Sequence, residues 1–164
     1  MAIAKWPLRI YWIKAPQLGR IAVMPRPHPA AFAELKAAGV DCVVSLLEIA
    51  EAEQLGLARE DQLANVAGIH FLHLPVVDHG IPTDVAAVEK ISSDIMARLK
   101  AGQGVAVHCY AGIGRSPLLI AAVLIDSGMD AYAACDLISD ARGVTVPEMA
   151  EQVEWLLKYE LRRR

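Results

Sequence analysis

A cysteine and an arginine, with five residues between them, stand where a strand-like run gives way to a helix-like run, in the stretch VAVHCYAGIGRSP (105–117). A tight turn that enters a helix directs successive backbone N–H groups at one point, where the helix terminus adds partial positive charge. Gly112 and Gly114 permit the positive φ that a concave nest requires. Arg115 offers a planar fork of donors for two oxygens of an oxyanion. A cysteine in such a field ionises readily, so the segment predicts a phosphate cradle with the Cys109 thiolate beneath the phosphorus atom.

The competing interpretation of this segment is purely structural. Cys109 would then be a small buried residue at a strand end, and Arg115 a surface cap. That interpretation requires the strand, cysteine, glycines, arginine and helix to follow one another by chance. Two other phosphate-binding loops do not fit. A Walker A loop ends in Gly-Lys-Ser/Thr, whereas Arg115 follows Gly114 here, and the dinucleotide fingerprint needs a third glycine where Pro117 stands.

The pattern His108-Cys109, five residues, Arg115-Ser116 resembles the signature of the cysteine-dependent protein tyrosine phosphatases, particularly the compact dual-specificity type. The resemblance is clearest between residues 69 and 128. It implies a phosphocysteine intermediate on Cys109, without a metal or cofactor. It also implies that Ser116 hydrogen-bonds the departing thiolate and that His108 holds the loop in shape. The phosphoryl oxygens would be bound by the Arg115 guanidinium and by the backbone N–H groups of Tyr110, Ala111, Gly112, Ile113, Gly114 and Arg115.

A second loop supplies a candidate general acid. Ile69–Leu74 reads as a strand, and Pro75 with Gly80-Ile81-Pro82 marks a loop after it. The resembled family carries an acid–base aspartate on a loop upstream of the cysteine, and Asp78 occupies that place. A turn or cap role is the alternative for Asp78. Asp84 is better explained as the N-cap of the following helix.

Other residues with chemical potential are assigned more modest roles. Residues 144–152 resemble the stretch that carries a water-positioning glutamine in some relatives, so Gln152 is a supporting candidate, with a position on a helix surface as its competing interpretation. His70 and His73 are three residues apart on a predicted strand and therefore point to opposite faces, so we expect no metal site there. Cys42 and Cys135 are expected to be small core residues.

The elements that must position these loops read as strands alternating with helices. The strands are expected at residues 9–14, 20–24, 40–47, 69–74 and 105–109. The helices are expected at residues 30–38, 48–54, 58–66, 84–100, 116–127, 131–141 and 147–162. Near-continuous apolar strands separated by helices imply an α/β fold with a mainly parallel sheet covered on both faces, and the resemblance implies a five-stranded mixed sheet. Such sheets bind ligands outside the carboxyl ends of their strands, which would bring Asp78 and Cys109 together.

Length and composition narrow the choice of function. The chain has 164 residues, which suits a single domain over residues 1–164. Its net charge of −3 provides no general attraction to nucleic acid or anionic membranes. The 3 cysteines without a signal sequence favour a reducing compartment, and no uncharged run reaches the ~18 residues of a membrane span. We expect a cytoplasmic monomer with no nucleic-acid or membrane partner.

Together these observations predict a phosphomonoester hydrolase that acts on phosphorylated protein or a small phosphomonoester. One alternative is a phosphatase of a non-protein ester, such as an inositol phosphate or a nucleotide. The lack of lysine between Cys109 and Arg115 weighs against a polyphosphorylated inositol. The other alternative is a phosphate-recognition module without turnover, but both a nucleophile and an acid are present. A sulfurtransferase or arsenate reductase would leave Asp78 unexplained.

Overall fold

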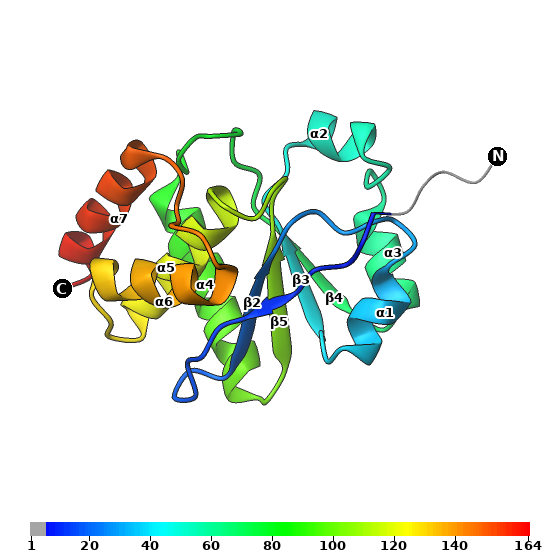
Figure 1. Cartoon of the computed structure of the whole chain (residues 1–164), viewed down its shortest axis with the longest axis horizontal. Helices are drawn as coiled ribbons and strands as arrows, with labels where there is room; N and C mark the ends of the chain where they lie inside the picture. The colour runs from blue at the N-terminus through cyan, green and yellow to red at the C-terminus, as the bar shows by residue number, and fades with distance from the viewer. Residues whose placement is uncertain (1–5) are drawn as a thin grey trace.

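A central sheet with helices on both of its faces organises the computed structural model, which describes residues 6–164 (Figure 1). The strands are β1 (Tyr11–Trp12), β2 (Arg20–Met24), β3 (Cys42–Ser45), β4 (His70–His73) and β5 (Gly104–His108). The helices are α1 (Phe32–Ala37), α2 (Ile49–Gln54), α3 (Glu60–Val66), α4 (Val85–Lys100), α5 (Arg115–Asp126), α6 (Ala131–Arg142) and α7 (Ala150–Arg163). The α/β class predicted from the sequence is confirmed.

The sheet has the strand order β1-β2-β5-β3-β4. Strands β2, β5, β3 and β4 run parallel to one another, and β1 runs antiparallel beside β2. The predicted five-stranded, mainly parallel mixed sheet is therefore confirmed. The opening hairpin is also present, but β1 is shorter than the predicted 9–14. The chain turns away from the ladder after Ile13, whose N–H still donates to the Ile21 carbonyl at 2.9 Å.

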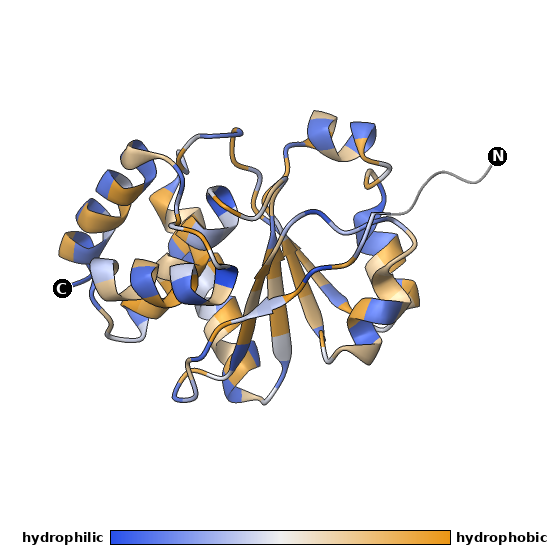
Figure 2. Cartoon of the chain, in the orientation of Figure 1, coloured by the Kyte–Doolittle hydropathy of each residue, from blue (hydrophilic) through white to orange (hydrophobic). Residues whose placement is uncertain are grey.

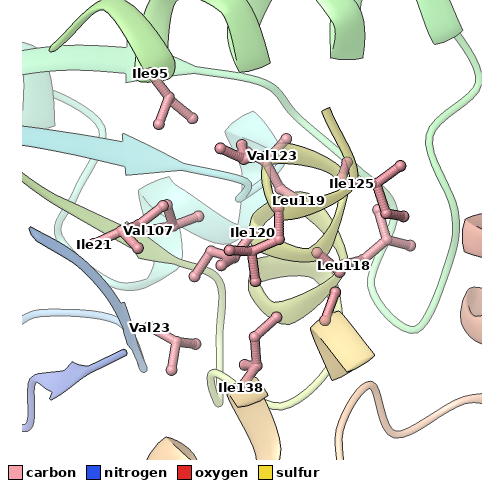
Figure 3. Packing of buried hydrophobic residues seen from close by; sticks show 14 of the residues in the cluster. Ile21, Val23, Ile95, Val107, Leu118, Leu119, Ile120, Val123, Ile125 and Ile138 are labelled. Carbon is pink, nitrogen blue, oxygen red and sulfur yellow. The ribbon is translucent and has the colours of Figure 1, made fainter. Parts of the chain in front are cut away.

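Alternate residues of the central strands are buried on opposite faces of the sheet. Ile21 and Val23 of β2 belong to the core that also contains residues of α4 to α7. Ala22 and Met24 belong to the core that contains residues of α1 and α3. The central strands β2, β3 and β5 are accordingly largely apolar (Figure 2). The side chains of α5, Ile120 among them, pack in the first core (Figure 3). Burial on both faces explains why these strands read as continuous apolar runs.

The carboxyl ends of three parallel strands meet at one edge of the sheet. There β3 leads into α2, β4 leads into the loop that carries Asp78, and β5 leads into Cys109. Figure 1 shows α2 and the loop after β4 at this same end of the molecule. The topology thus brings together segments that lie far apart in the sequence, as the rule for parallel sheets predicts.

Each of the predicted helices is present, with shifted boundaries. Asp84 is the N-cap of α4, and its carboxylate accepts a hydrogen bond from the Ala87 N–H at 3.2 Å, so the predicted cap is confirmed. Helix α7 begins at Ala150 and not at Pro147, because the preceding segment binds the loop after β5, where the Glu148 N–H donates to the Ile113 carbonyl at 2.8 Å. Within residues 6–164, no helix combines the length and apolar character needed to cross a bilayer.

Candidate active site

The loop between β5 and α5, residues 109–115, has the backbone shape of an anion nest; we call it the cradle loop. Gly112 has a φ of 73°, in the left-handed region where glycine is favoured. A Cβ atom at Gly112 would lie 2.8 Å from the carbonyl carbon of Met24 and 2.8 Å from the nitrogen of Pro25. Both conformation and space therefore require glycine here, where the loop packs against the end of β2.

Gly114 is favoured for a different reason from the one predicted. Its φ is −126°, so the expectation of a positive φ at this position is wrong. A Cβ atom there would lie 3.0 Å from the Oε1 atom of Glu148 and 3.1 Å from the Nε2 atom of Gln152. Glycine leaves room for the side chains that approach the loop from the start of α7.

The carbonyl groups of the cradle loop accept hydrogen bonds from surrounding residues. The Tyr110 carbonyl accepts from the backbone N–H of Arg26 at 3.0 Å and from its Nη1 atom at 3.2 Å. The carbonyls of Ala111 and Gly112 accept from the Nη2 and Nε atoms of Arg142, both at 3.2 Å. The Ile113 carbonyl accepts from the Glu148 N–H at 2.8 Å. By contrast, the backbone N–H groups of residues 110–114 donate to no atom of residues 6–164. Because the carbonyls are tied to surrounding residues, these N–H groups remain available to an oxyanion.

Cys109 and Ser116 form a close pair at the base of the loop. The Cys109 Sγ atom lies 3.2 Å from the Ser116 Oγ atom. The two residues are 3% and 0% exposed, respectively. When the sulfur is a thiolate, the hydroxyl is the only donor of the two, so Ser116 can donate to it. The geometry therefore allows the role that the resemblance implies for Ser116.

Arg115 points its guanidinium inward, where it is held by several acceptors. The Nη1 and Nη2 atoms lie 2.7 and 3.0 Å from the two carboxylate oxygens of Glu51. Nη1 also donates to the Val76 carbonyl at 2.8 Å, and Nη2 to the Oδ1 atom of Asp78 at 2.9 Å. Burial lowers the pKa of Arg115, but the hydrogen bonds that its guanidinium donates to Glu51 and the negative charges of Cys109, Glu51 and Asp78 outweigh this effect, so the pKa is raised.

Glu51 is the main functional candidate that the sequence did not indicate. A buried arginine requires a carboxylate partner, which was a usable signal. The residues around α2 are rich in glutamate, however, and their sequence does not show which one meets Arg115. Burial raises the pKa of Glu51, but hydrogen bonds from Arg115 and from the Glu48 backbone N–H, together with the charge of Arg115, make it lower than usual. Glu51 therefore holds Arg115 as a carboxylate.

Replacing Glu51→Gln should loosen Arg115 while preserving the overall fold. We expect a loss of about 2 kcal/mol in the free energy of unfolding, because the buried guanidinium loses its bidentate partner. We also expect kcat/KM for an aryl phosphate to fall by about 10- to 100-fold, because the arginine is misplaced. Denaturant unfolding and initial rates measure these two effects. Equal stability and activity in the variant and the wild type would show that Glu51 does not position Arg115.

The stability part of this effect should depend on pH. Since the folded-state pKa of Glu51 is lowered, its stabilising contribution is fully present above the unfolded value of about 4.3. That contribution is lost as the pH falls through the lowered folded-state pKa. The difference in unfolding free energy between wild type and Glu51→Gln should therefore be constant at neutral pH and shrink at strongly acidic pH.

Asp78 lies beside Arg115, on the loop that follows β4. Its Oδ1 atom accepts hydrogen bonds from Arg115 at 2.9 Å and from the His79 backbone N–H at 3.0 Å, and its side chain is 49% exposed. The His79 ring contacts the Glu148 carboxylate at 3.0 Å, and its backbone φ is 61°. The Asp78 loop is therefore fastened both to Arg115 and to the segment before α7.

Gln152 is buried, so the interpretation that places it on the helix surface is wrong. Its exposed fraction is 0%. The Nε2 atom donates to the Gly80 carbonyl at 3.0 Å, and the Oε1 atom accepts from the Met149 N–H at 3.2 Å. The first turn of α7 thus packs between the Asp78 loop and Gly114, which the helical periodicity of the sequence alone does not indicate.

His108 joins the cradle loop to a buried carboxylate. Its Nδ1 atom lies 3.2 Å from the Cys109 carbonyl oxygen, and its Nε2 atom lies 2.7 Å from the Oε2 atom of Glu60. The backbone contact has the form predicted for a residue that holds the loop in shape. Glu60 was not predicted, because its burial at the start of α3 depends on packing between distant segments.

Comparisons with known proteins identify the family that this chain resembles. The profile of the family described as "Polymorphic toxin system, DSP-PTPase phosphatase" matches residues 21–129. Cyclin-dependent kinase inhibitor 3 of Rattus norvegicus is 27% identical over 128 residues, which are 77% of this chain and 60% of that protein. Protein tyrosine phosphatase type IVA 3 of Mus musculus is 35% identical over 97 residues, 56% of this chain and 55% of that protein. The chain therefore aligns with less than two thirds of each relative.

Solved structures share the fold over most of the chain. Kinase associated phosphatase with its catalytic-site cysteine replaced by serine has a TM-score of 0.88 at 22% identity, covering 98% of each chain. Tk-PTP in the active form has a TM-score of 0.77 at 30% identity, covering 88% of this chain and 93% of that one. With the profile match over residues 21–129, these likenesses show that the chain belongs to the DSP-PTPase family of dual-specificity and tyrosine phosphatases.

Proposed function

We propose that this chain hydrolyses phosphomonoesters of phosphorylated proteins through a phosphocysteine intermediate. The observation that carries the proposal is the polarity of the cradle loop. Its N–H groups over residues 110–114 are unpaired within residues 6–164, while Cys109 lies at its base and Arg115 is fixed by Glu51. Unpaired N–H groups and a guanidinium stabilise the charge on the oxygens of a transferring phosphoryl group. Hydrolysis of para-nitrophenyl phosphate without added metal tests the proposal.

The first step transfers the phosphoryl group to sulfur. The Cys109 thiolate forms a bond to phosphorus as the bond between phosphorus and the leaving oxygen breaks, and Asp78 gives its proton to that oxygen. In the resting structure, Asp78 and Arg115 hold each other. A phosphoryl group that takes up donors of Arg115 would release Asp78 from this contact.

The second step returns the enzyme to its starting state. Asp78, now a carboxylate, removes a proton from water as the water oxygen bonds to phosphorus and the bond between sulfur and phosphorus breaks. Ser116 donates a hydrogen bond to the thiolate that leaves. Gln152 donates to the Gly80 carbonyl and thereby supports the loop that carries Asp78.

Replacing Asp78→Asn should slow the reaction in a way that depends on the leaving group. With phenyl phosphate, whose leaving oxygen needs a proton, we expect kcat to fall by about 100- to 1000-fold, the usual contribution of a general acid. With para-nitrophenyl phosphate the loss in the first step should be much smaller, because the leaving oxygen is stable as an anion. Single-turnover rates for the two esters measure this difference. If both esters slow equally, Asp78 is not the acid.

The remaining expectations belong to the same proposal. The mechanism uses no metal and needs a reduced sulfur, which suits a reducing compartment such as the cytoplasm. Cys42, Cys109 and Cys135 are all free thiols. Burial raises the pKa of Cys42 and of Cys135 to about 11, which keeps these two thiols protonated and poorly reactive. We propose that the chain acts as a monomer on protein substrates, without nucleic-acid or membrane partners.

A further inference from the structure

A hollow beside the cradle loop combines acidic and apolar walls. Its volume is about 510 Å³. It is lined by Glu48, Glu51, Gln54, Leu55, Val77, Asp78 and Tyr110. All of these residues lie in the described part of the chain, and none of them carries a positive charge. Because Glu51 and Asp78 both contact Arg115, the part of a substrate next to the phosphoryl group would lie against this hollow.

Glu48 is the one carboxylate lining the hollow whose negative charge is not neutralised when a substrate reacts. Glu51 is neutralised by its two contacts with Arg115, at 2.7 and 3.0 Å. Asp78 carries a proton when it acts as the acid. Glu48, by contrast, forms no ion pair with any residue of the range 6–164. The hollow therefore keeps a negative charge in the reactive complex, which attracts cations and repels additional phosphates.

The apolar side of the hollow is held in place from behind. Val77 is 57% exposed and Tyr110 is 44% exposed, so both offer apolar surface to a ligand. The guanidinium of Arg26 lies 4.1 Å from the ring centroid of Tyr110, and its Nη1 atom donates to the Tyr110 carbonyl at 3.2 Å. Arg26 itself does not line the hollow. A fixed aromatic wall beside an exposed valine suits the flat ring of a phosphotyrosyl residue.

We infer that the hollow lined by Glu48, Val77 and Tyr110 is a subsite for a lysine or arginine side chain that neighbours the phosphotyrosine of a protein substrate. The inference rests on the proposed function and adds a substrate class to it. The cation lies near Glu48, while the phosphotyrosine ring packs on the apolar wall formed by Val77 and Tyr110. Inositol polyphosphates and nucleotides carry further negative charge into the same place and are disfavoured.

Phosphotyrosyl peptides that differ only in the flanking residues test this inference. Three peptides carry arginine, alanine or glutamate beside the phosphotyrosine, and kcat/KM is measured for each at low ionic strength. Each partly exposed charge pair contributes about threefold, so the arginine peptide should exceed the glutamate peptide by about tenfold. The ratio should shrink in high salt because exposed charges are screened. Equal rates, or a preference for the glutamate peptide, would overturn the inference.

Variants on α2 and at its cap locate the effect. Glu48→Gln removes the charge and should reduce the arginine-to-glutamate ratio to about threefold or less. Gln54→Lys adds a positive charge to the same hollow and should shift the ratio toward the glutamate peptide. Glu53→Gln is the matched control, because Glu53 is an exposed glutamate of α2 that does not line the hollow. A ratio that is unchanged in Glu48→Gln, or that falls equally in Glu53→Gln, would contradict the assignment.

Failure of this inference differs from failure of the proposed function. If the wild type does not hydrolyse para-nitrophenyl phosphate, the proposed activity itself is wrong. If it hydrolyses that ester but shows no charge preference among the peptides, only the subsite is wrong. A higher kcat/KM for an inositol polyphosphate than for the arginine peptide would also overturn the subsite, while leaving phosphatase activity in place.

Discussion

Replacing Cys109→Ser should reduce turnover of para-nitrophenyl phosphate by about 10⁴-fold or more, since a hydroxyl at this position does not ionise at neutral pH and cannot replace the thiolate. Binding of inorganic phosphate should persist, because the N–H groups of the cradle loop and the Arg115 guanidinium are unchanged. It should even tighten, since the negative charge of the sulfur is removed. Steady-state rates and calorimetric titration with inorganic phosphate measure the two quantities.

Cys135→Ser is the matched control for this variant. Cys135 lies on α6, is 9% exposed, and belongs to the core on one face of the sheet. The same chemical change there should leave kcat close to the wild-type value. Turnover that survives in Cys109→Ser, or disappears equally in Cys135→Ser, would rule out attack by the Cys109 sulfur.

Replacing Arg115→Lys should have the second largest effect. We expect kcat/KM to fall by about 1000-fold or more, the range seen when an arginine that binds a transferring phosphoryl group is lost. Lysine keeps the positive charge but not the fork that reaches Glu51, Val76 and the phosphoryl oxygens together. The phosphate affinity of the variant should fall along with the rate, unlike that of Cys109→Ser.

Arg98→Lys controls for the general effect of shortening an arginine. Arg98 lies on α4 and bonds Gln103 at 3.2 Å, near the amino end of β5 and away from the cradle loop. Its replacement should leave phosphate hydrolysis unchanged. An Arg115→Lys enzyme with wild-type kcat/KM would show that the guanidinium geometry described above does not serve the reaction.

The sequence was sufficient to predict the parts of this site that local chemistry and topology determine. The order of strand, cysteine, glycines and arginine indicates an anion nest, and Gly112 adopts the positive φ that the nest needs. The rule for parallel sheets places Asp78 and Cys109 at one edge, and Asp78 indeed contacts Arg115, six residues after the cysteine. These inferences needed only neighbouring residues and the direction of the strands.

The parts that sequence reasoning missed depend on packing between distant segments. Glu51 meets Arg115 across 64 positions of the chain, and Glu60 meets His108 across 48. Periodicity describes which face of a helix is apolar, but it does not say what that face contacts. For the same reason the sequence left a helix-surface position open for Gln152, although its side chain bonds the Gly80 carbonyl. At Gly114, the side chains of Glu148 and Gln152 limit the space for a Cβ atom, and a positive φ plays no part.

Trapping the covalent intermediate would show whether the Cys109 sulfur attacks phosphorus. The enzyme is mixed with excess para-nitrophenyl phosphate and quenched in acid within the first turnovers, and its peptides are then analysed by mass spectrometry. We expect a single added phosphoryl group on the peptide that contains Cys109, and none on the Cys109→Ser protein. Turnover without any phosphorylated cysteine, or with the phosphoryl group on another residue such as Ser116, would contradict it.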